Sequence, residues 1–296
     1  MNRTKTTLTQ FEGELPGLSQ RSFRLRWDSV LTVFLLLIGA AFMIAPFAWI
    51  MQVAFSSSAR AYQLPPQFFP SELTIQNFAN VLQDVPYLNF IRNSFFVTIC
   101  ITIGQLITCP MAAYAFARLN FPGKNVLFIV LLATLLIPVQ VTIVPLFIFM
   151  RQIGLYNTLW SLILPALISP FGVFLLRQYF MTIPTELEDA ARIDGASYIT
   201  IFWRIIIPLS LPAIMTLGII TFVFWWNEYF TPLILIHDAE LQVLPVGLTL
   251  LQGRYSAGAA GNIAAGVTMA VIPTLLVFLL LQRNIIKSIA ATGVKG

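Results

Sequence analysis

The stretch Val30–Phe55 reads VLTVFLLLIGAAFMIAPFAWIMQVAF and contains no charged side chain. A helix of this length extends about 39 Å at 1.5 Å per residue, which exceeds the ~30 Å hydrocarbon core of a bilayer. The run follows a polar leader, is too long for the apolar part of a secretory signal, and precedes no small-residue cleavage site. It is therefore predicted to be a membrane-spanning helix.

The composition of the whole chain agrees with this interpretation. Hydrophobic residues make up 58% of the 296 residues, and charged residues only 10% against roughly 25% in soluble domains. The expected fold is an all-α integral membrane protein with six spans, in a membrane domain of residues 30–287 between tails 1–29 and 288–296. The five further spans are Phe95–Phe116, Val126–Met150, Thr158–Leu176, Leu211–Ile236 and Ile263–Leu281.

Prolines fall inside these spans. In lipid they are expected to kink helices rather than to end them, because neighbouring helices shelter the broken turn. They are Pro46, Pro110, Pro138, Pro145, Pro165, Pro170, Pro212, Pro232 and Pro273.

Basic residues orient the predicted spans. Of the 17 lysines and arginines, only Arg60, Arg92, Arg151 and Arg254 fall on one side. The positive-inside rule places the other side, with both termini and the fourth connection, in the cytoplasm of a multi-pass inner-membrane protein. The net charge of +5 then reflects contact with membrane lipid and requires no nucleic-acid partner.

Several kinds of chemistry are not expected. Cys100 and Cys109 would lie on opposite faces of one helix, which excludes a disulfide between them. His237 is the only histidine, so histidine metal clusters and catalytic triads are not expected. No Walker signature occurs, so any ATPase must be another chain.

The fourth connection, at about residues 184–208, is long and patterned. Thr185 and Glu188 have the spacing of a capping box, and Glu186 and Asp189 favour the positive end of a helix. Gly195 is placed to end this short helix in a left-handed turn. Ser197 can then cap a second helix that runs to Pro208 and the membrane.

Two uses of the short helix fit the residues. One face carries Leu187, Ala190, Ala191 and Asp194, and its small alanines would let a partner's groove approach closely. The helix could instead lie on lipid headgroups.

The segment Asp189-Ala190-Ala191, three residues, Gly195, nine residues and Ile205-Ile206-Ile207-Pro208 resembles the EAA loop of binding-protein-dependent ABC importer permeases. The loop pattern of that family is E-A-A-x3-G-x9-I-x-L-P, from which Asp189 and Ile207 depart conservatively. Further pieces, such as Trp226-Asn227-Glu228, resemble the carbohydrate branch and the six-span permease subunits of the maltose transporter family.

The resemblance implies an ABC type I importer permease with a coupling helix that enters a cleft of a cytoplasmic ATPase. The implied coupling residues are Glu188, Asp189, Ala190, Ala191, Gly195, Ile205 and Pro208. The implied partners are a second homologous permease, an ATPase dimer that binds ATP and Mg, and a periplasmic or lipid-anchored substrate-binding protein. No cofactor is expected in this chain. The binding protein would contact the connections at about Ser56–Arg92 and His237–Gly261.

The implied function is import of a sugar or oligosaccharide by ATP-driven alternating access. A polyol phosphate is an alternative solute, and an ion-coupled secondary transporter is a rival class that normally shows internal repeats and several midplane charges. Neither signal is found in this sequence.

Glu228 is the one acidic residue inside an apolar run, and such groups commonly face a cavity or a partner. With Gln140, Trp226 and Asn227 it is a candidate for the substrate pathway, because aromatic rings also suit the C–H faces of sugars. Glu228 could equally be a wetted anchor at the outer end of its helix.

Overall fold

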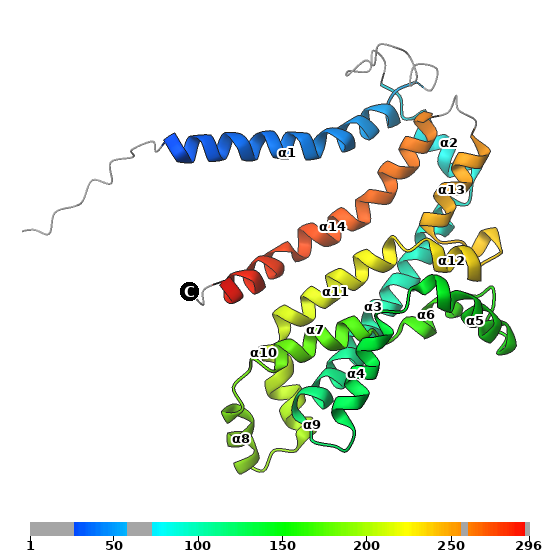
Figure 1. The fold of residues 1–296 in the computed structure, drawn as a ribbon. Coiled ribbons are helices and arrows are strands. Elements are labelled where there is room, and N and C mark those ends of the chain that lie inside the picture. The colour runs from blue at the N-terminus through cyan, green and yellow to red at the C-terminus, as the bar shows by residue number, and fades with distance from the viewer. Residues whose placement is uncertain (1–26, 58–72, 256–259, 294–296) are drawn as a thin grey trace, which may run out of the picture. The chain divides into compact units, whose positions relative to one another are not determined.

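The computed structural model of this chain describes residues 27–57, 73–255 and 260–293. The chain divides into two units, Met1–Ala48 and Trp49–Gly296. The first holds most of α1 (Trp27–Ala54), and the second holds the helices described below (Figure 1). These are α2 (Gln76–Asp84), α3 (Tyr87–Arg118), α4 (Lys124–Thr134), α5 (Val139–Gln152), α6 (Trp160–Ala166), α7 (Pro170–Phe180), α8 (Glu186–Ile193), α9 (Tyr198–Ile201), α10 (Ile207–Leu209), α11 (Leu211–Trp226), α12 (Phe230–Leu235), α13 (Leu244–Arg254) and α14 (Ala260–Gly293).

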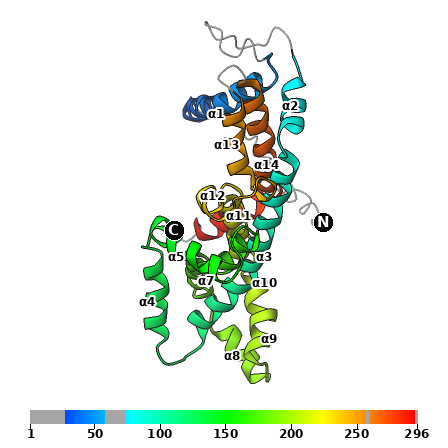
Figure 2. The same cartoon turned by 90° about the vertical axis from the view of Figure 1, so that its right-hand side faces the viewer.

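The long helix α3 organises the second unit. It packs against α7 and α11, and α11 packs in turn against α14 (Figures 1 and 2). Near the end of α3, a Cβ on Gly172 of α7 would lie only 2.9 Å from the Cys109 sulfur. The absence of a side chain at Gly172 therefore allows α7 to approach α3 closely.

Membrane-length helices are present as the composition predicts. Four described segments are long and apolar enough to cross a bilayer: Val30–Ala54, Tyr87–Arg118, Trp160–Phe180 and Ala260–Leu280. Two bent pairs could supply two more spans, α4 with α5 at 98° and Tyr198–Leu209 with α11 at 76°.

Not every proline behaves as predicted. Pro46, Pro110, Pro145, Pro165 and Pro273 lie inside helices. Pro138, Pro170 and Pro212 instead stand at helix starts, so the prediction that these three only kink is wrong. The reason is the fixed φ and missing N–H of proline, which suit the first turn of a helix better than its interior.

The break between α6 and α7 is held by side chains of α3. Because Pro170 has no N–H, the Ala166 carbonyl lacks its usual helical donor. Gln105 Nε2 donates to this carbonyl at 2.8 Å, and Thr108 Oγ1 donates to the Leu167 carbonyl at 2.6 Å. Buried backbone groups of the break are thus satisfied without water, as the interior of a membrane protein requires.

The predicted outer connections are described only in part. Residues 58–72, which include Pro65, Pro66 and Pro70, lie outside the described residues. In the other outer connection, His237–Gly261, the amides of His237 and Asp238 donate to Asn157 Oδ1. Asn93 Nδ2 donates to the carbonyls of Glu240 and Gln242, so α3 also holds this connection.

Candidate functional site

The short helix predicted after residue 184 is α8, but it begins differently from the prediction. Glu186, Glu188 and Asp189 do occupy its first turn. Thr185 has helical backbone angles (φ −69°, ψ −25°), and its side chain makes no capping hydrogen bond. The predicted capping box is therefore wrong, because an N-cap requires a non-helical backbone and because the Glu188 side chain points elsewhere.

Glu188 is buried against Arg118, the last residue of α3. Arg118 Nε lies 2.7 Å from Glu188 Oε1, and the two side chains are only 9% and 4% exposed. Arg118 also donates through one Nη to the carbonyls of Phe180, at 2.8 Å, and Ile183. A single guanidinium thus joins the ends of α3 and α7 to the first turn of α8, and we call these groups the Arg118 junction.

The end of α8 has the predicted left-handed turn. Gly195 has φ +81°, its amide donates to the Arg192 carbonyl, and the amide of Ala196 donates to the Ala191 carbonyl. These two bonds form a Schellman motif, in which glycine is favoured at the left-handed position. A Cβ on Gly195 would meet no atom within 4 Å, so the constraint is conformational rather than steric.

Ser197 caps the second helix, as predicted, by accepting from the Thr200 amide at 3.2 Å. The helix is α9 up to Ile201 and then widens into a π-helix over Phe202–Ile206 before α10. Pro208 cannot donate to the Arg204 carbonyl, and the Ile207 amide reaches back five residues to Phe202 instead. Ile205 is half-buried here and Pro208 is exposed.

The opposite face of α8 is open. Leu187 is 45% exposed and Ile193 is 87% exposed, with Ala190 exposed between them. Tyr198 and Ile199 at the start of α9 are also exposed. Apolar side chains presented together at a loop are a characteristic of contact surfaces. We call Leu187, Ala190, Ile193, Tyr198 and Ile199 the α8 face.

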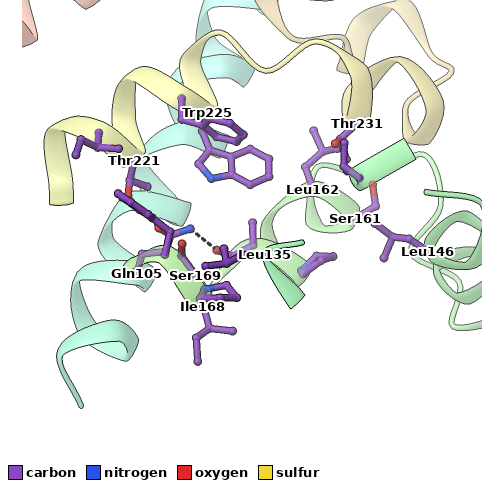
Figure 3. Close-up of a pocket in the computed structure, with 17 residues that line it drawn as sticks. Gln105, Leu135, Leu146, Ser161, Leu162, Ile168, Ser169, Thr221, Trp225 and Thr231 are labelled. Carbon is purple, nitrogen blue, oxygen red and sulfur yellow. Dashed lines mark hydrogen bonds between the residues drawn. The ribbon is translucent and has the colours of Figure 1, made fainter. Parts of the chain in front are cut away.

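A separate cavity of about 600 Å³ lies among α3, α5, α6, α7, α11 and α12. Figure 3 shows Gln105, Ser169 and Thr221 at one end of it and Ser161 and Thr231 at the other, with the Trp225 indole between them. Its lining is mostly apolar with a few polar groups, and its volume is that of a small-molecule site.

The four predicted pathway residues are not brought together in this cavity, whose lining contains none of them. Gln140 is exposed in the first turn of α5. Trp226 is buried, stacks on Phe222 with 5.8 Å between ring centroids, and donates through Nε1 to the Ala270 carbonyl.

The side chains of the other two pathway candidates form hydrogen bonds with residues three or four positions away in the sequence. Asn227 is exposed and donates to the Val223 carbonyl. The Glu228 carboxylate accepts from the Thr231 amide at 2.9 Å and so caps the start of α12. A transport role for these four residues stays a prediction.

Gln105 and Arg118 were not predicted as site residues. Gln105 could have been found as a polar residue in the middle of an apolar run. Arg118 could have been found as a cation at the end of a span. Its ion pair with Glu188, however, joins residues that are 70 positions apart. No local sequence signal predicts such a contact.

Comparisons with known proteins agree with these features. The family model described as "Binding-protein-dependent transport system inner membrane component" matches residues 106–290. The arabinooligosaccharides transport system permease protein AraQ of Halalkalibacterium halodurans is 36% identical over 77% of this chain and 82% of its own length. The sn-glycerol-3-phosphate transport system permease protein UgpE of Yersinia pestis is 30% identical over 86% of this chain and 93% of its own length.

The described fold also resembles a solved structure. In the crystal structure of a bacterial ABC transporter involved in the import of the acidic polysaccharide alginate, one chain superposes with a TM-score of 0.74 and 27% identity. The match covers 86% of this chain and 95% of that one. Fold and sequence therefore agree, and the chain belongs to the family of inner-membrane components of binding-protein-dependent ABC transport systems.

Proposed function

We propose that this chain forms half of the translocation pathway of an ATP-driven importer for a sugar or oligosaccharide. Two named relatives transport arabinooligosaccharides and alginate, and a third transports sn-glycerol-3-phosphate. The uncharged lining of the cavity favours a neutral sugar over the phosphate ester, because a buried phosphate needs cationic or donor-rich partners.

The observation that carries the proposal is the Arg118 junction beneath the exposed α8 face. We assign the α8 face to contact with a cytoplasmic ATPase dimer that binds ATP and Mg. Because Arg118 joins α8 to both α3 and α7, a movement of α8 would be transmitted to the helices that line the cavity. Glu188, Asp189, Ala190, Ala191, Gly195, Ile205 and Pro208 are the proposed coupling residues.

The cavity is the proposed solute path of this subunit. Trp225 offers a ring face to sugar C–H groups, and Ser169 and Thr231 offer hydroxyls. A second, homologous permease would complete the wall. Six spans with both termini in the cytoplasm would place α8 on the ATPase side. The segments 237–261 and 56–92 would then face a substrate-binding protein.

The test is reconstitution of the whole transporter, with its second permease, ATPase and binding protein, into liposomes. Arabino-oligosaccharides, malto-oligosaccharides, alginate oligosaccharides and sn-glycerol-3-phosphate form the solute panel. We expect one sugar class to stimulate both ATP hydrolysis and uptake. Uptake that follows an ion gradient in the absence of ATP would instead support an ion-coupled carrier.

A surface variant tests the coupling assignment directly. Leu187→Glu should prevent stable association with the ATPase in mild detergent, because a charge replaces an apolar contact. Leu82→Glu is the matched control, because Leu82 is a leucine of nearly equal exposure but belongs to α2 in the predicted outer connection. Equal recovery of the ATPase with both variants would contradict the assignment.

A further inference from the structure

A second cavity, of about 610 Å³, opens where α3, α4 and α7 meet. Lys124 and Arg177 are its two charged lining residues, and its lining contains no acidic residue. Both cations lie near the Arg118 junction but do not take part in it. The proposed function does not use this cavity.

The two cations are held in place by backbone groups and a ring. Lys124 Nζ donates to the Leu119 carbonyl at 2.8 Å, and Arg177 Nε donates to the Phe116 carbonyl at 3.1 Å. The Arg177 guanidinium also lies 4.1 Å from the centroid of the Phe128 ring. These contacts fix the side chains without neutralising either charge.

The positive charges of Lys124 and Arg177 also repel each other. Arg177 acts on Lys124 as a repelling like charge. Between described residues, ion pairs join Arg118 to Glu188 and Arg192 to Asp189, and neither Lys124 nor Arg177 takes part in one. Two like charges that share one cavity disfavour each other, and an anion between them would relieve this repulsion.

The backbone of the cavity also favours an anion. Gly123 has φ +79°, and the Lys124 amide donates to Phe121, as in a Pro-Gly turn. This turn starts α4, so the amides of Asn125 and Val126 at the cavity wall are first-turn donors. The positive end of the helix adds to the field of the two side chains.

The surroundings distinguish a lipid from a free ion. Val126 at the cavity wall is 65% exposed, and Leu127 and Val130 continue an exposed apolar surface along α4. Met181 is exposed on the α7 side of the cavity. A basic pocket beside an apolar surface matches a molecule with an anionic headgroup and acyl chains.

We propose that the Lys124–Arg177 cavity binds the phosphate of an anionic phospholipid, with its acyl chains along α4. The placement of this cavity in the cytoplasmic leaflet rests on the proposed topology, but the binding itself does not. Such a lipid would neutralise the two cations and fill the space between α4 and α7.

The test uses the intact transporter purified in mild detergent, with phosphatidylglycerol and phosphatidylcholine as probes in native mass spectrometry. Phosphatidylglycerol should be retained in preference to phosphatidylcholine. Lys124→Gln should weaken its retention by about fivefold, from the ~1 kcal/mol that one basic residue contributes near an anionic leaflet. Lys124→Arg should preserve it. Arg204→Gln, which removes an exposed cation outside this cavity, is the control.

A second variant keeps the test decisive if Lys124→Gln fails to fold. Asn125→Glu places an acid at the cavity wall and in the first turn of α4, where a negative charge favours the helix. It should abolish phosphatidylglycerol retention while the complex still assembles. Equal retention by wild type, Lys124→Gln and Asn125→Glu would overturn the proposal.

Two further outcomes would also overturn it. If inorganic phosphate displaces the lipid completely at equal concentration, the site binds a free anion. If the variants lose a protein subunit rather than lipid, the cavity holds a partner's carboxylate. None of these measurements requires transport, so failure of the proposed sugar import would leave this result unaffected.

Discussion

The Arg118 junction and the α6–α7 break meet the same structural need with different chemistry. In both places a side chain of α3 donates to backbone carbonyls where another helix ends. At the break the donors are neutral, Gln105 and Thr108. At the junction the donor is a guanidinium, and the Glu188 carboxylate balances it. The charged residues of α3, Arg92 and Arg118, both lie outside the predicted span Phe95–Phe116, and the donors within that span are neutral.

Removal of Arg118 should have the largest effect. Arg118→Met leaves Glu188 buried without a counter-ion, which costs about 3–5 kcal/mol in stability. Transport should be lost, and the melting temperature of the purified complex should fall. A thermal-shift assay and an uptake assay measure the two effects.

The paired change Arg118→Met with Glu188→Met should recover much of the lost stability, since no charge then remains buried. It should not recover transport if the pair transmits movement from α8. Arg192→Gln, which breaks an exposed pair at 3.8 Å, is the control and should cost under about 1 kcal/mol. No recovery in the double variant would contradict a direct energetic link between Arg118 and Glu188.

Gln105→Leu tests the neutral donors that hold the α6–α7 break. It removes the donor to Ala166 and the acceptor for Thr221, so each unsatisfied group should cost about 1–3 kcal/mol. Gln140→Leu is the matched control, because Gln140 is exposed, and it should change stability by less than about 0.5 kcal/mol. Equal thermal stability of the two variants would show that the break does not depend on α3.

Gly195→Val separates coupling from stability. A valine at φ +81° is strained by roughly 1–2 kcal/mol although its Cβ meets nothing within 4 Å. Transport per ATP hydrolysed should fall while the protein remains inserted. Gly154→Val is the control, with φ +73° and equally open space after α5. If both variants lose coupling equally, the turn at the end of α8 has no special role.

Glu228→Gln should have the smallest effect. Its Oε1 can still accept from the Thr231 amide, so the cap of α12 should persist within about 0.5–1 kcal/mol. Transport assays over a range of solute concentrations distinguish the two roles of Glu228. Unchanged apparent affinity and rate leave only the capping role, whereas a reduced rate at equal stability supports a role in the pathway.

The parts of the fold that depend on composition and local sequence could be predicted. Uncharged runs such as Val30–Phe55 require a bilayer, and the φ required at Gly195 and the hydroxyl at Ser197 define the turn after α8. Each of these signals acts within a few residues of the chain.

Where a residue fits two different local structures, the sequence could not decide between them. Pro138 and Pro170 can either kink a helix or begin one, and tertiary donors such as Gln105 decide between these outcomes. Glu188 fits a capping box by spacing, but the stronger partner, Arg118, is remote in sequence. The cavity lining was missed for the same reason, since it draws residues from six helices.

The cavity beside Trp225 has an electrical consequence. None of its lining residues carries a charge, so this wall offers an ion no counter-charge. An uncharged sugar that moves past it displaces no protein charge, and the membrane potential does no work on that step. If this cavity is part of the proposed solute path, a sodium ion or a proton would have to lose hydration there without gaining a counter-charge from this wall.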